Sequence, residues 1–438
     1  MASPRKNAPK PNTQELALVP VEEQPYPLPE DWKWVRGHAL FKPQVSLRPS
    51  GTTFKYIDID AVNNKNQTIQ SAKILPTSEA PSRANRGVHE GDTLFSMVRP
   101  YLRNIAYVDA SLSDAIASTG FYICSPLDGC NSRYIFHMMT SCYVVDGLNK
   151  FMKGDNSPSV RKGDIENFPF PLPPLDEQER IVTRIESLFA KLDEAKEKVE
   201  SVLDSYETRK AAILHKAFTG ELTAKWREER GIERDSWKRQ TLNAVCSSIF
   251  DGDHMPPPKA ETGIPFLVIS NVNTGSISFE NTRFVPQTYF DSLSSTRKPK
   301  QNDVLYTLVG SYGIPVLVDT NKNFCFQRHM ALLKPHSIDS KFLWYFLQTK
   351  EAFLYASQVA TGTAQLTVPI KKLREMPILH PSLNEQQEIS RILDSLLEKE
   401  QQSKEAAETV LEQIDLMKKA ILAKAFRGEL GEKHLFIQ

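Results

Sequence analysis

The stretch KAAILHKAFTGEL, residues 210–222, returns almost unchanged as KKAILAKAFRGEL at residues 418–430. The two copies lie 208 positions apart in a chain of 438 residues. The same shift aligns the preceding residues without a gap, from Pro169 on Pro377 to Leu222 on Leu430. A repeat with so long a period indicates the duplication of a whole domain rather than a solenoid of short repeats.

The repeated segments carry a helical pattern. In residues 176–219, apolar residues recur at alternating spacings of four and three, the heptad pattern of a coiled coil. No Gly or Pro interrupts this segment before Gly220, so one long helix is predicted. The second copy repeats the pattern, with Glu400 and Ser403 where apolar residues are expected. We expect the two helices to pair; two separate surface helices, each packed on its own domain, are the alternative.

The ends of the two helices are expected to have a structural role. Each KAF-x-GEL end should pack against the lobe that lies in the other half of the chain. The residues expected to make this contact are Ala217, Phe218 and Leu222 in the first copy and Ala425, Phe426 and Leu430 in the second.

Two regions without the helical pattern precede the helices. GDTLFSMVRPY at residues 91–101 resembles NDVLYTLVGSY at residues 302–312, and short apolar runs of this kind predict strands. The later apolar segments SRYIFHMM, at residues 132–139, and SKFLWYFL, at residues 340–347, each predict a buried helix. Each region is therefore predicted to be an α+β domain. The connecting loops differ between the copies, as expected for one fold directed at two different ligands.

Composition places the chain among soluble globular proteins, with 24% charged and 40% hydrophobic residues. No run approaches the roughly 20 apolar residues that a membrane span needs, so no membrane partner is expected. Residues 1–24 are rich in Pro, Asn and Lys and lack the apolar core of a secretory signal, so a flexible tail and a cytoplasmic location are predicted. The five cysteines form no C-x-x-C pair, and no metal site is predicted.

Charge is distributed unevenly along the chain. Residues 25–174 hold 16 basic and 14 acidic side chains, a net charge of +2, and residues 234–381 hold 16 and 11, a net charge of +5. The helical segments 175–233 and 382–438 each carry a net charge of −3. Nucleic acid is therefore expected at the two lobes and partner proteins at the helices.

Catalytic and cofactor motifs are missing from the sequence. It contains no G-x-x-x-x-G-K-[ST], G-x-G-x-x-G, H-E-x-x-H or G-x-S-x-G. His254, in the loop DGDHMPPP, is the most suggestive histidine, but a recognition loop or a plain turn is favoured over a catalytic loop there. This absence favours a binding module and no catalytic residue, although it does not exclude catalysis.

The order of these parts resembles the specificity subunit of a Type I restriction–modification enzyme, over about residues 25–431. The Pro-rich segments that run into L-[DN]-E-Q, such as PLPPLDEQ at residues 171–178, and the paired KAF-x-GEL ends carry the resemblance. It implies two target-recognition domains, each reading one half of a split site in double-stranded DNA. It also implies that the two helices pair antiparallel, as a spacer and as a docking surface for two modification subunits.

The resemblance assigns the chemistry to partner subunits. Adenine methylation with S-adenosylmethionine would belong to the two modification subunits. Translocation and cleavage with ATP and Mg would belong to two restriction subunits that bind through them. No cofactor is therefore expected in this chain, which would be a non-catalytic subunit.

The predicted fold class is α+β. Two duplicated α+β target-recognition domains would be joined by two long helices that form an antiparallel coiled coil, with pseudo-two-fold symmetry. The predicted segments are the tail 1–24, the first target-recognition domain 25–174, spacer helix and linker 175–233, the second target-recognition domain 234–381, and the second spacer helix with the C-terminal segment 382–438.

Candidate DNA-binding residues are basic, amide and hydroxyl side chains in the loops of the two domains, because such groups contact base edges and phosphates. The polar loops that begin at Gly154 and Gly362 occupy the same place in both copies. The first domain contributes Lys42, Arg48, Arg99, Tyr101, Arg103, Lys153, Asn156 and Ser157. The second contributes His254, Lys259, Asn271, Tyr312, Gln327, Arg328, Thr363 and Gln365.

Two other interpretations of the sequence remain open. One is a coiled-coil adaptor that holds two proteins and binds no DNA. The other is a nuclease or methyltransferase whose site has an unfamiliar sequence. Sequence-specific DNA binding separates the first from the specificity subunit, and turnover by the isolated chain separates the second.

Overall fold

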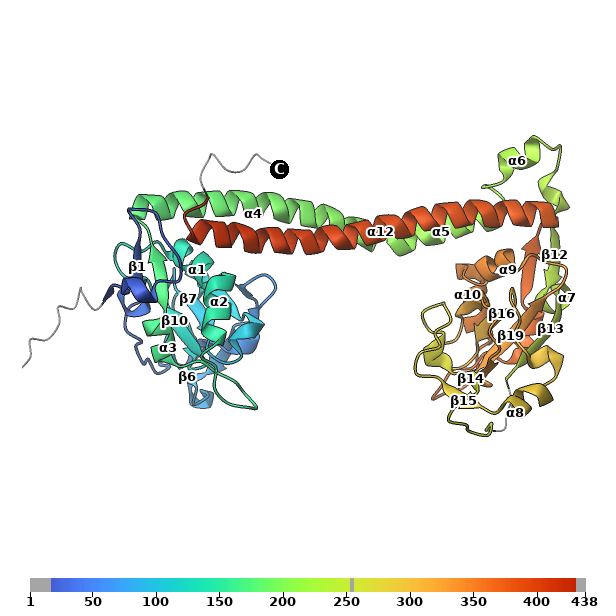
Figure 1. Cartoon of the computed structure of the whole chain (residues 1–438), viewed down its shortest axis with the longest axis horizontal. Helices are drawn as coiled ribbons and strands as arrows, with labels where there is room; N and C mark the ends of the chain where they lie inside the picture. Colours follow the sequence, from blue (N-terminus) through green and yellow to red (C-terminus); the bar gives the residue numbers. More distant parts are fainter. Residues whose placement is uncertain (1–16, 253–255, 431–438) are drawn as a thin grey trace, which may run out of the picture. The chain divides into compact units, whose positions relative to one another are not determined.

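A computed structural model of the chain describes residues 17–252 and 256–430. The chain divides into two compact units. Unit 1 takes the residues up to 199 and those from 409 onward, and unit 2 takes residues 200–408. Each unit combines one lobe of short strands and helices with a segment of both long helices (Figure 1).

The described part of the first lobe contains four small sheets, antiparallel except for the pairing of β2 with β9. They are β1 (Lys33–Arg36) with β11 (Pro169–Leu172); β10 (Phe121–Cys124), β7 (Thr93–Ser96) and β8 (Ile105–Tyr107); β5 (Lys73–Pro76), β2 (Thr53–Ile57), β9 (Ile116–Ser118) and β6 (Ala84–Gly87); and the hairpin β3 (Val62–Asn63) with β4 (Thr68–Ile69). The helices are α1 (Ser132–Thr140), α2 (Cys142–Asn149) and α3 (Lys162–Asn167).

The second lobe repeats this arrangement with different loops. Its sheets are β12 (Lys238–Thr241) with β20 (Pro377–His380); β13 (Cys246–Asp251), β19 (Met330–Pro335), β16 (Val304–Thr307) and β17 (Pro315–Leu317); and β15 (Arg283–Val285), β14 (Ile264–Leu267) and β18 (Cys325–Phe326). Its helices are α7 (Leu242–Val245), α8 (Gln287–Ser292), α9 (Ser340–Phe346), α10 (Lys350–Val359) and α11 (Ile370–Glu375). The predicted strands around β7 and β16 and the predicted buried helices α1 and α9 are confirmed.

Helix ends form part of the core of each unit, as the sequence predicted. In unit 1, Phe426 is buried, and its ring meets that of Tyr134 on α1 edge to face, with centroids 5.4 Å apart. In unit 2, Phe218 packs against Phe342 on α9, with ring centroids 5.0 Å apart. Ala217, Ala425 and Leu430 are buried, and Leu222 packs against the core of the second lobe.

The repeated glycine of KAF-x-GEL ends both helices in the same way. Gly220 and Gly428 have φ of +83° and +74°, a left-handed conformation that favours glycine. Each N–H donates to the carbonyl three residues earlier, Ala217 or Ala425, over 3.2 Å. A Cβ on Gly428 would lie 2.3 Å from Pro29 Cγ, so a larger residue would displace the chain packed on this end.

The first long helix is interrupted, contrary to the sequence prediction of one helix over 176–219. A single residue, Ser205, separates α4 (Leu175–Asp204) from α5 (Tyr206–Phe218). The Ser205 hydroxyl donates to the carbonyls of Ser201 and Val202, both over 3.0 Å. Such bonding of a serine to the preceding turn competes with the helical pattern and bends helices, which the heptad spacing alone does not reveal.

The second long helix, α12 (Leu383–Phe426), is continuous although Glu400 stands at a position where the heptad pattern expects an apolar residue. In unit 2 the Glu400 carboxylate accepts a hydrogen bond of 2.8 Å from Nε of Arg209 on α5. An ion pair between the helices therefore takes the place of an apolar contact at this position.

Contacts within each unit show that the two helices run antiparallel. In unit 1, Arg180 lies near Leu430, whereas Asp193, further along α4, pairs with Lys418. In unit 2, Arg209 pairs with Glu400, whereas the later Thr223 bonds Glu385. As the residue number rises along the first half of each pair, the number of the partner residue in or after α12 falls, which defines an antiparallel arrangement. A coiled coil that is continuous through both units stays a prediction.

The repeated glutamine after the Pro-rich segments fastens each long helix to its lobe. The Gln178 side chain accepts from the N–H of Asn131, which caps α1, and donates to the carbonyl of Pro173. Gln386 makes the equivalent bonds to Asp339, which caps α9, and to Pro381. Both glutamines are buried, so their amides satisfy backbone groups that would otherwise lack partners.

Residues 17–24 differ from the prediction of a free tail over 1–24. Val19 is buried, and its N–H donates to the carbonyl of Trp34 on β1 over 3.0 Å. Leu18 forms a single bridge with Val35 on the same strand. This part of the predicted tail therefore packs on the first lobe.

The five cysteines form no disulfide, and Cys124, Cys246 and Cys325 are buried. Burial raises the pKa of the Cys246 thiol to about 12, so it remains protonated at neutral pH. Among the described residues, no group of three or more His, Cys, Asp or Glu side chains could hold a metal ion. Nor does any helix in the described ranges combine the length and apolar character needed to cross a bilayer.

Acid is expected to destabilise unit 1 through Glu186 on α4. A hydrogen bond from Nε2 of His137 and the guanidinium of Arg133 lower the pKa of Glu186 from 4.5 to about 2. A carboxylate with a lowered pKa stabilises the fold above its unfolded pKa, and this contribution is lost as pH falls toward about 2. Glu186→Gln should therefore lose less thermal stability than wild type between pH 7 and pH 3. Glu179→Gln, at an exposed position of α4, is the control and should behave as wild type.

Candidate nucleic-acid interface

Two exposed loops of the first lobe come together at the end of β7. Arg99, which follows this strand, has φ of +48°, and its N–H donates to the carbonyl of Pro158 over 2.8 Å. Its guanidinium donates to the carbonyl of Asn156 over 2.9 Å. A second loop is closed by paired backbone bonds between Lys153 and Ser159. The structure thereby gathers five predicted residues, all exposed, namely Arg99, Tyr101, Lys153, Asn156 and Ser157.

Arg103 turns inward, unlike its neighbours in this turn. Its guanidinium donates to the carbonyl of Thr140 over 2.8 Å and lies 3.2 Å from Sγ of Cys142. These bonds hold the turn after β7 against the connection between α1 and α2. The contacts favour a positioning role for Arg103.

The second lobe builds an equivalent pair of loops with different side chains. The N–H of Gly310 donates to the carbonyl of Leu366, and Thr361 pairs with Thr367. A Cβ on Gly310, which has φ of +72°, would lie 2.9 Å from the Gln365 amide nitrogen. The close approach of these loops therefore depends on a glycine where the first lobe has Arg99.

Tyr312 lies beside these loops on an aromatic surface. Its ring stacks on Phe353 at an interplanar angle of 10°, and its hydroxyl donates to Ser357. Phe353, Leu354 and Leu366 are each about half exposed, at 47%, 54% and 45%. The structure thus brings Tyr312 and Gln365 together with Thr363, which is exposed in the second loop.

The other predicted residues of the second lobe lie on separate parts of it. Gln327 and Arg328 occupy the turn between β18 and β19, which packs tightly against Gly252, since a Cβ there would be 2.6 Å from the Gln327 carbonyl carbon. Lys259 is exposed next to Ala260, which bonds β15. His254 lies outside the described residues.

Asn271 is buried rather than exposed. Its amide oxygen accepts from the N–H of Val268 over 3.0 Å, and its nitrogen donates to the carbonyl of Glu280 over 3.0 Å. Both ends of the side chain are thus used to shape the loop after β14. This placement favours a structural role for Asn271, which its polar character alone did not distinguish from DNA binding.

Lys42 and Arg48 lie away from the Arg99 turn. The N–H of Lys42 donates to Ser125, which follows β10 at its Cys124 end. Cys124 pairs with Thr93, whereas Arg99 follows the other end of β7. Both Lys42 and Arg48 are exposed.

The candidate cations of these loops lack carboxylate partners in the described residues. Within residues 17–252 and 256–430, no salt bridge involves Lys42, Arg48, Arg99, Lys153, Lys259 or Arg328. Exposed cations without a carboxylate partner are available for phosphate groups.

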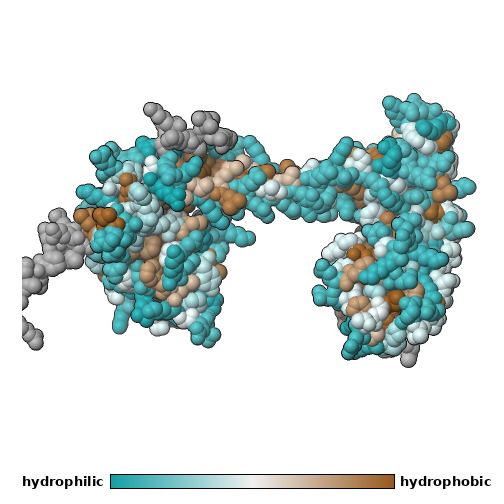
Figure 2. Space-filling view, viewed as in Figure 1, coloured by the Kyte–Doolittle hydropathy of each residue, from teal (hydrophilic) through white to brown (hydrophobic). Residues whose placement is uncertain are grey.

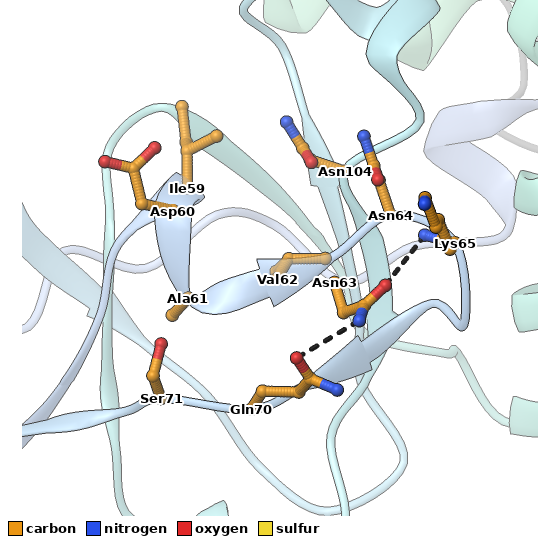
Figure 3. A pocket seen from close by; sticks show the side chains of 10 residues that line it. All are labelled: Ile59, Asp60, Ala61, Val62, Asn63, Asn64, Lys65, Gln70, Ser71 and Asn104. Atoms are coloured by element: carbon orange, nitrogen blue, oxygen red, sulfur yellow. Dashed lines mark hydrogen bonds between the residues drawn. The ribbon is translucent and has the colours of Figure 1, made fainter. Parts of the chain in front are cut away.

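A polar run at the tip of the hairpin β3–β4 is not among the DNA-binding residues predicted from the sequence. Residues 63–67 read NNKNQ, and Asn64, Lys65 and Asn66 are exposed. The hairpin borders a pocket of about 460 Å³ that also includes Asn104 (Figure 3). Four amides around one lysine were a visible signal, but only the fold shows that they adjoin the Arg99 turn.

An apolar groove lies on the paired helices of unit 1. It has a volume of about 300 Å³, and Figure 2 shows hydrophobic surface over α4 and α12. Its walls are formed by Leu188, Leu192, Met417, Ala420, Ile421 and Leu430, with Lys191, Lys424 and Glu429 at the sides. Exposed apolar surface of this kind is typical of a protein-binding site.

Two segments of the chain, residues 38–203 and 236–413, match the family described as the Type I restriction modification DNA specificity domain. This chain belongs to that family. Each specificity domain comprises one lobe and most of the long helix that follows it. The family match therefore covers the same duplication that the repeated KAF-x-GEL ends indicated.

Individual relatives agree with the family match. The chain is 25% identical over 318 residues to the Type I restriction enzyme EcoBI specificity subunit of Escherichia coli, covering 69% of this chain. The chain spans 66% of the length of that relative. A chain solved in a study of assembly and conformational transition of the type I restriction–modification system is 28% identical, with a TM-score of 0.78, and covers 92% of this chain and all of that one. The HsdS subunit of Thermoanaerobacter tengcongensis is also 28% identical, with a TM-score of 0.65 and coverage of 93% and 100%.

Proposed function

We propose that this chain is the DNA-recognition subunit of a Type I restriction–modification complex and that its two lobes read the two halves of a split target. The observation that carries the proposal is the shared pair of loops after β7 and β16. Equivalent backbone bonds hold both pairs, but their side chains differ, with Arg99 in one lobe and Gly310 in the other. One framework with different surface residues suits the reading of two different sequences.

DNA would be bound by the exposed loops of each lobe. Unpaired cations such as Arg99 and Lys153 would contact phosphates, while the amides of Asn156 and Gln365 are suited to base edges. Tyr312 and Phe353 offer an aromatic surface next to these amides. Most protein–DNA hydrogen bonds go to phosphate and sugar, so only some of these residues would read sequence.

The paired helices would dock two modification subunits. The apolar groove of unit 1 supports this role, because its apolar walls are flanked by lysines that a partner's carboxylates could meet. Restriction subunits would join through the modification subunits. The helix ends, where Phe426 is buried and Phe218 packs against the core of the second lobe, would instead hold each lobe in place.

Methylation, translocation and cleavage would take place in the partner subunits. S-adenosylmethionine, ATP and Mg would bind there, and this chain would supply the choice of sequence. A cytoplasmic location accompanies this role, because the DNA of the cell is its substrate.

A binding and methylation experiment tests the proposal. The full chain, alone and with its modification subunits, is mixed with genomic DNA and S-adenosylmethionine, and methylated adenines are mapped. The expected result is a single split sequence that is methylated only when both components are present. Assembly without sequence-specific DNA binding would support the adaptor instead. Turnover by the chain alone, abolished by a substitution within it, would show that it is an enzyme.

Arg99→Ala should weaken binding of the complex to its DNA by roughly tenfold, since a hydrogen bond to a charged group contributes about 1.5 kcal/mol. If Arg99 contacts a phosphate, the salt dependence of binding should also fall by about one counterion while the methylated sequence stays the same. Lys162→Ala is the matched control, because Lys162 is exposed in the same lobe but already pairs with Glu166. Unchanged affinity and salt dependence in Arg99→Ala would remove this residue from the interface.

A further inference from the structure

The hairpin β3–β4 presents a fixed, amide-rich tip. The Asn63 side chain accepts from the N–H groups of Lys65 and Asn66 over 2.9 and 3.2 Å and donates to Gln70 over 3.1 Å. The Asn64 amide donates to the carbonyl of Leu102 over 2.9 Å. The bond from Asn64 to Leu102 ties the tip to the turn that begins at Arg99. The tip is therefore held in place by its own side chains and is joined to the proposed DNA surface.

A polar pocket lies between this tip and the start of β8. Its walls include Asn63, Asn64, Lys65, Gln70 and Asn104, and Figure 3 shows the side chains of Asn64 and Asn104 pointing in the same direction. Among the residues that the structure describes, the Asn104 side chain makes no hydrogen bond and Lys65 forms no salt bridge. The pocket thus offers a free donor and acceptor on one amide, next to a free cation.

The second lobe shows that the fold does not require these polar groups. Asn104 and Ile314 are equivalent, because their carbonyls accept from Ser96 and Thr307 at the ends of β7 and β16, each over 3.1 Å. Ile314 packs against the apolar core together with Ile277 and Phe279. The place that is a polar pocket in one lobe is therefore apolar in the other.

The loop that borders this pocket also differs between the two lobes. A backbone bond from Gln70 to Ala61 closes it in the first lobe, and a bond from Ser278 to Asn271 closes it in the second, over 2.9 and 2.8 Å. Residues 62–69 lie between the ends of the first bond and residues 272–277 between those of the second, so the first loop is two residues longer. Variation in length and polarity between fixed ends is expected of a recognition element.

We infer that the β3–β4 tip enters the major groove and that Asn104 reads an adenine in the half-site of the first lobe. This inference rests on the proposed function. A two-stranded ribbon fits the major groove, and an asparagine with both ends of its amide free can bond N6 and N7 of adenine together. Lys65, at the tip, contacts a backbone phosphate and fixes the depth of entry. Asn64 is a positioning residue, since its amide is used to hold the tip against Leu102.

The test uses the full chain in complex with its modification subunits and a library of targets varied at every position. Asn104→Ala should reduce the preference for adenine at one base pair of a single half-site by about 10- to 100-fold and leave the other half-site unchanged. Lys65→Ala should weaken binding to all targets alike and lower the salt dependence by about one counterion. Asn167→Ala, at an exposed amide that ends α3, is the control and should change nothing.

The outcomes separate this inference from the function on which it rests. If the wild-type complex shows no sequence preference, the proposed function is wrong. If the wild-type complex is specific and Asn104→Ala retains every preference, the adenine contact is wrong. If the complex with Asn104→Ala fails to assemble, the Lys65→Ala variant provides the test. An unchanged salt dependence of DNA binding in Lys65→Ala would then overturn the entry of the tip into the groove.

Discussion

Exchange of residues 242–376 for the corresponding segment of another specificity subunit is expected to replace one half of the methylated sequence and to keep the other half. The second lobe would bring its own recognition loops, and the first lobe would retain its loops. The expected change is complete at one half-site, because all residues proposed to contact that half lie inside the exchanged segment. Mapping of methylated adenines before and after the exchange measures it.

The structure explains why this exchange should leave the fold intact. Strands β12 and β20 pair from Lys238 with His380 to Thr241 with Pro377, so both ends of the exchanged segment leave from one two-stranded sheet. The exchange leaves this sheet unchanged, and it also leaves the bond from Gln386 on α12 to the carbonyl of Pro381. Residues of α9 that meet Phe218, namely Phe342 and Phe346, have to be kept apolar in the donor segment.

The matched experiment exchanges residues 37–168 of the first lobe, between β1 and β11, and should change the opposite half-site. Two exchanges that alter the same half, or one that alters both, would contradict independent reading by the lobes. A complex that assembles with the new segment and methylates the original sequence would place recognition outside the lobes.

Glu385→Ala should destabilise unit 2 by about 3–5 kcal/mol, because it removes one partner of a buried ion pair. The Glu385 carboxylate is buried and accepts from Arg227 over 2.6 Å, from Thr223 over 2.7 Å and from Nε1 of Trp237 over 3.2 Å. Arg227 is itself buried and would keep an uncompensated charge. The measurement is chemical denaturation, followed by tryptophan fluorescence.

The equivalent position in unit 1 provides the control. Glu177 lies 208 residues before Glu385, but it pairs with Arg180 on the surface, where 27% and 46% of the two side chains are exposed. An exposed pair contributes at most about 1 kcal/mol, so Glu177→Ala should be mild. Replacing Glu385 and Arg227 together by leucine should recover part of the lost stability, since no buried charge then remains. Equal effects of the two alanine substitutions would show that the buried network around Glu385 is not important.

The sequence by itself determined the duplication, the helical character of its repeated segments and the packing of Phe218 and Phe426 against the lobes. These features depend on local periodicity and on a shift of 208 that keeps residues in register, both of which can be read from one chain. The apolar runs around β7 and β16 were visible for the same reason, because a buried strand needs apolar residues whatever its neighbours are.

Other features were decided only by the tertiary structure, because they depend on partners distant in the chain. Asn271 and Arg103 have the side chains of DNA-binding residues, yet the fold uses both to bond backbone groups. Asn104 attracts no attention in the sequence, and it acquires a role only because the hairpin β3–β4 is tied to Leu102. Glu177 and Glu385 occupy matching places in the repeat. Glu385 is buried because Arg227 and Trp237 pack on it and bond it, whereas Glu177 lies at the surface. A side chain's chemistry is local, whereas its exposure and its free hydrogen-bonding groups are fixed by whatever the fold packs against it.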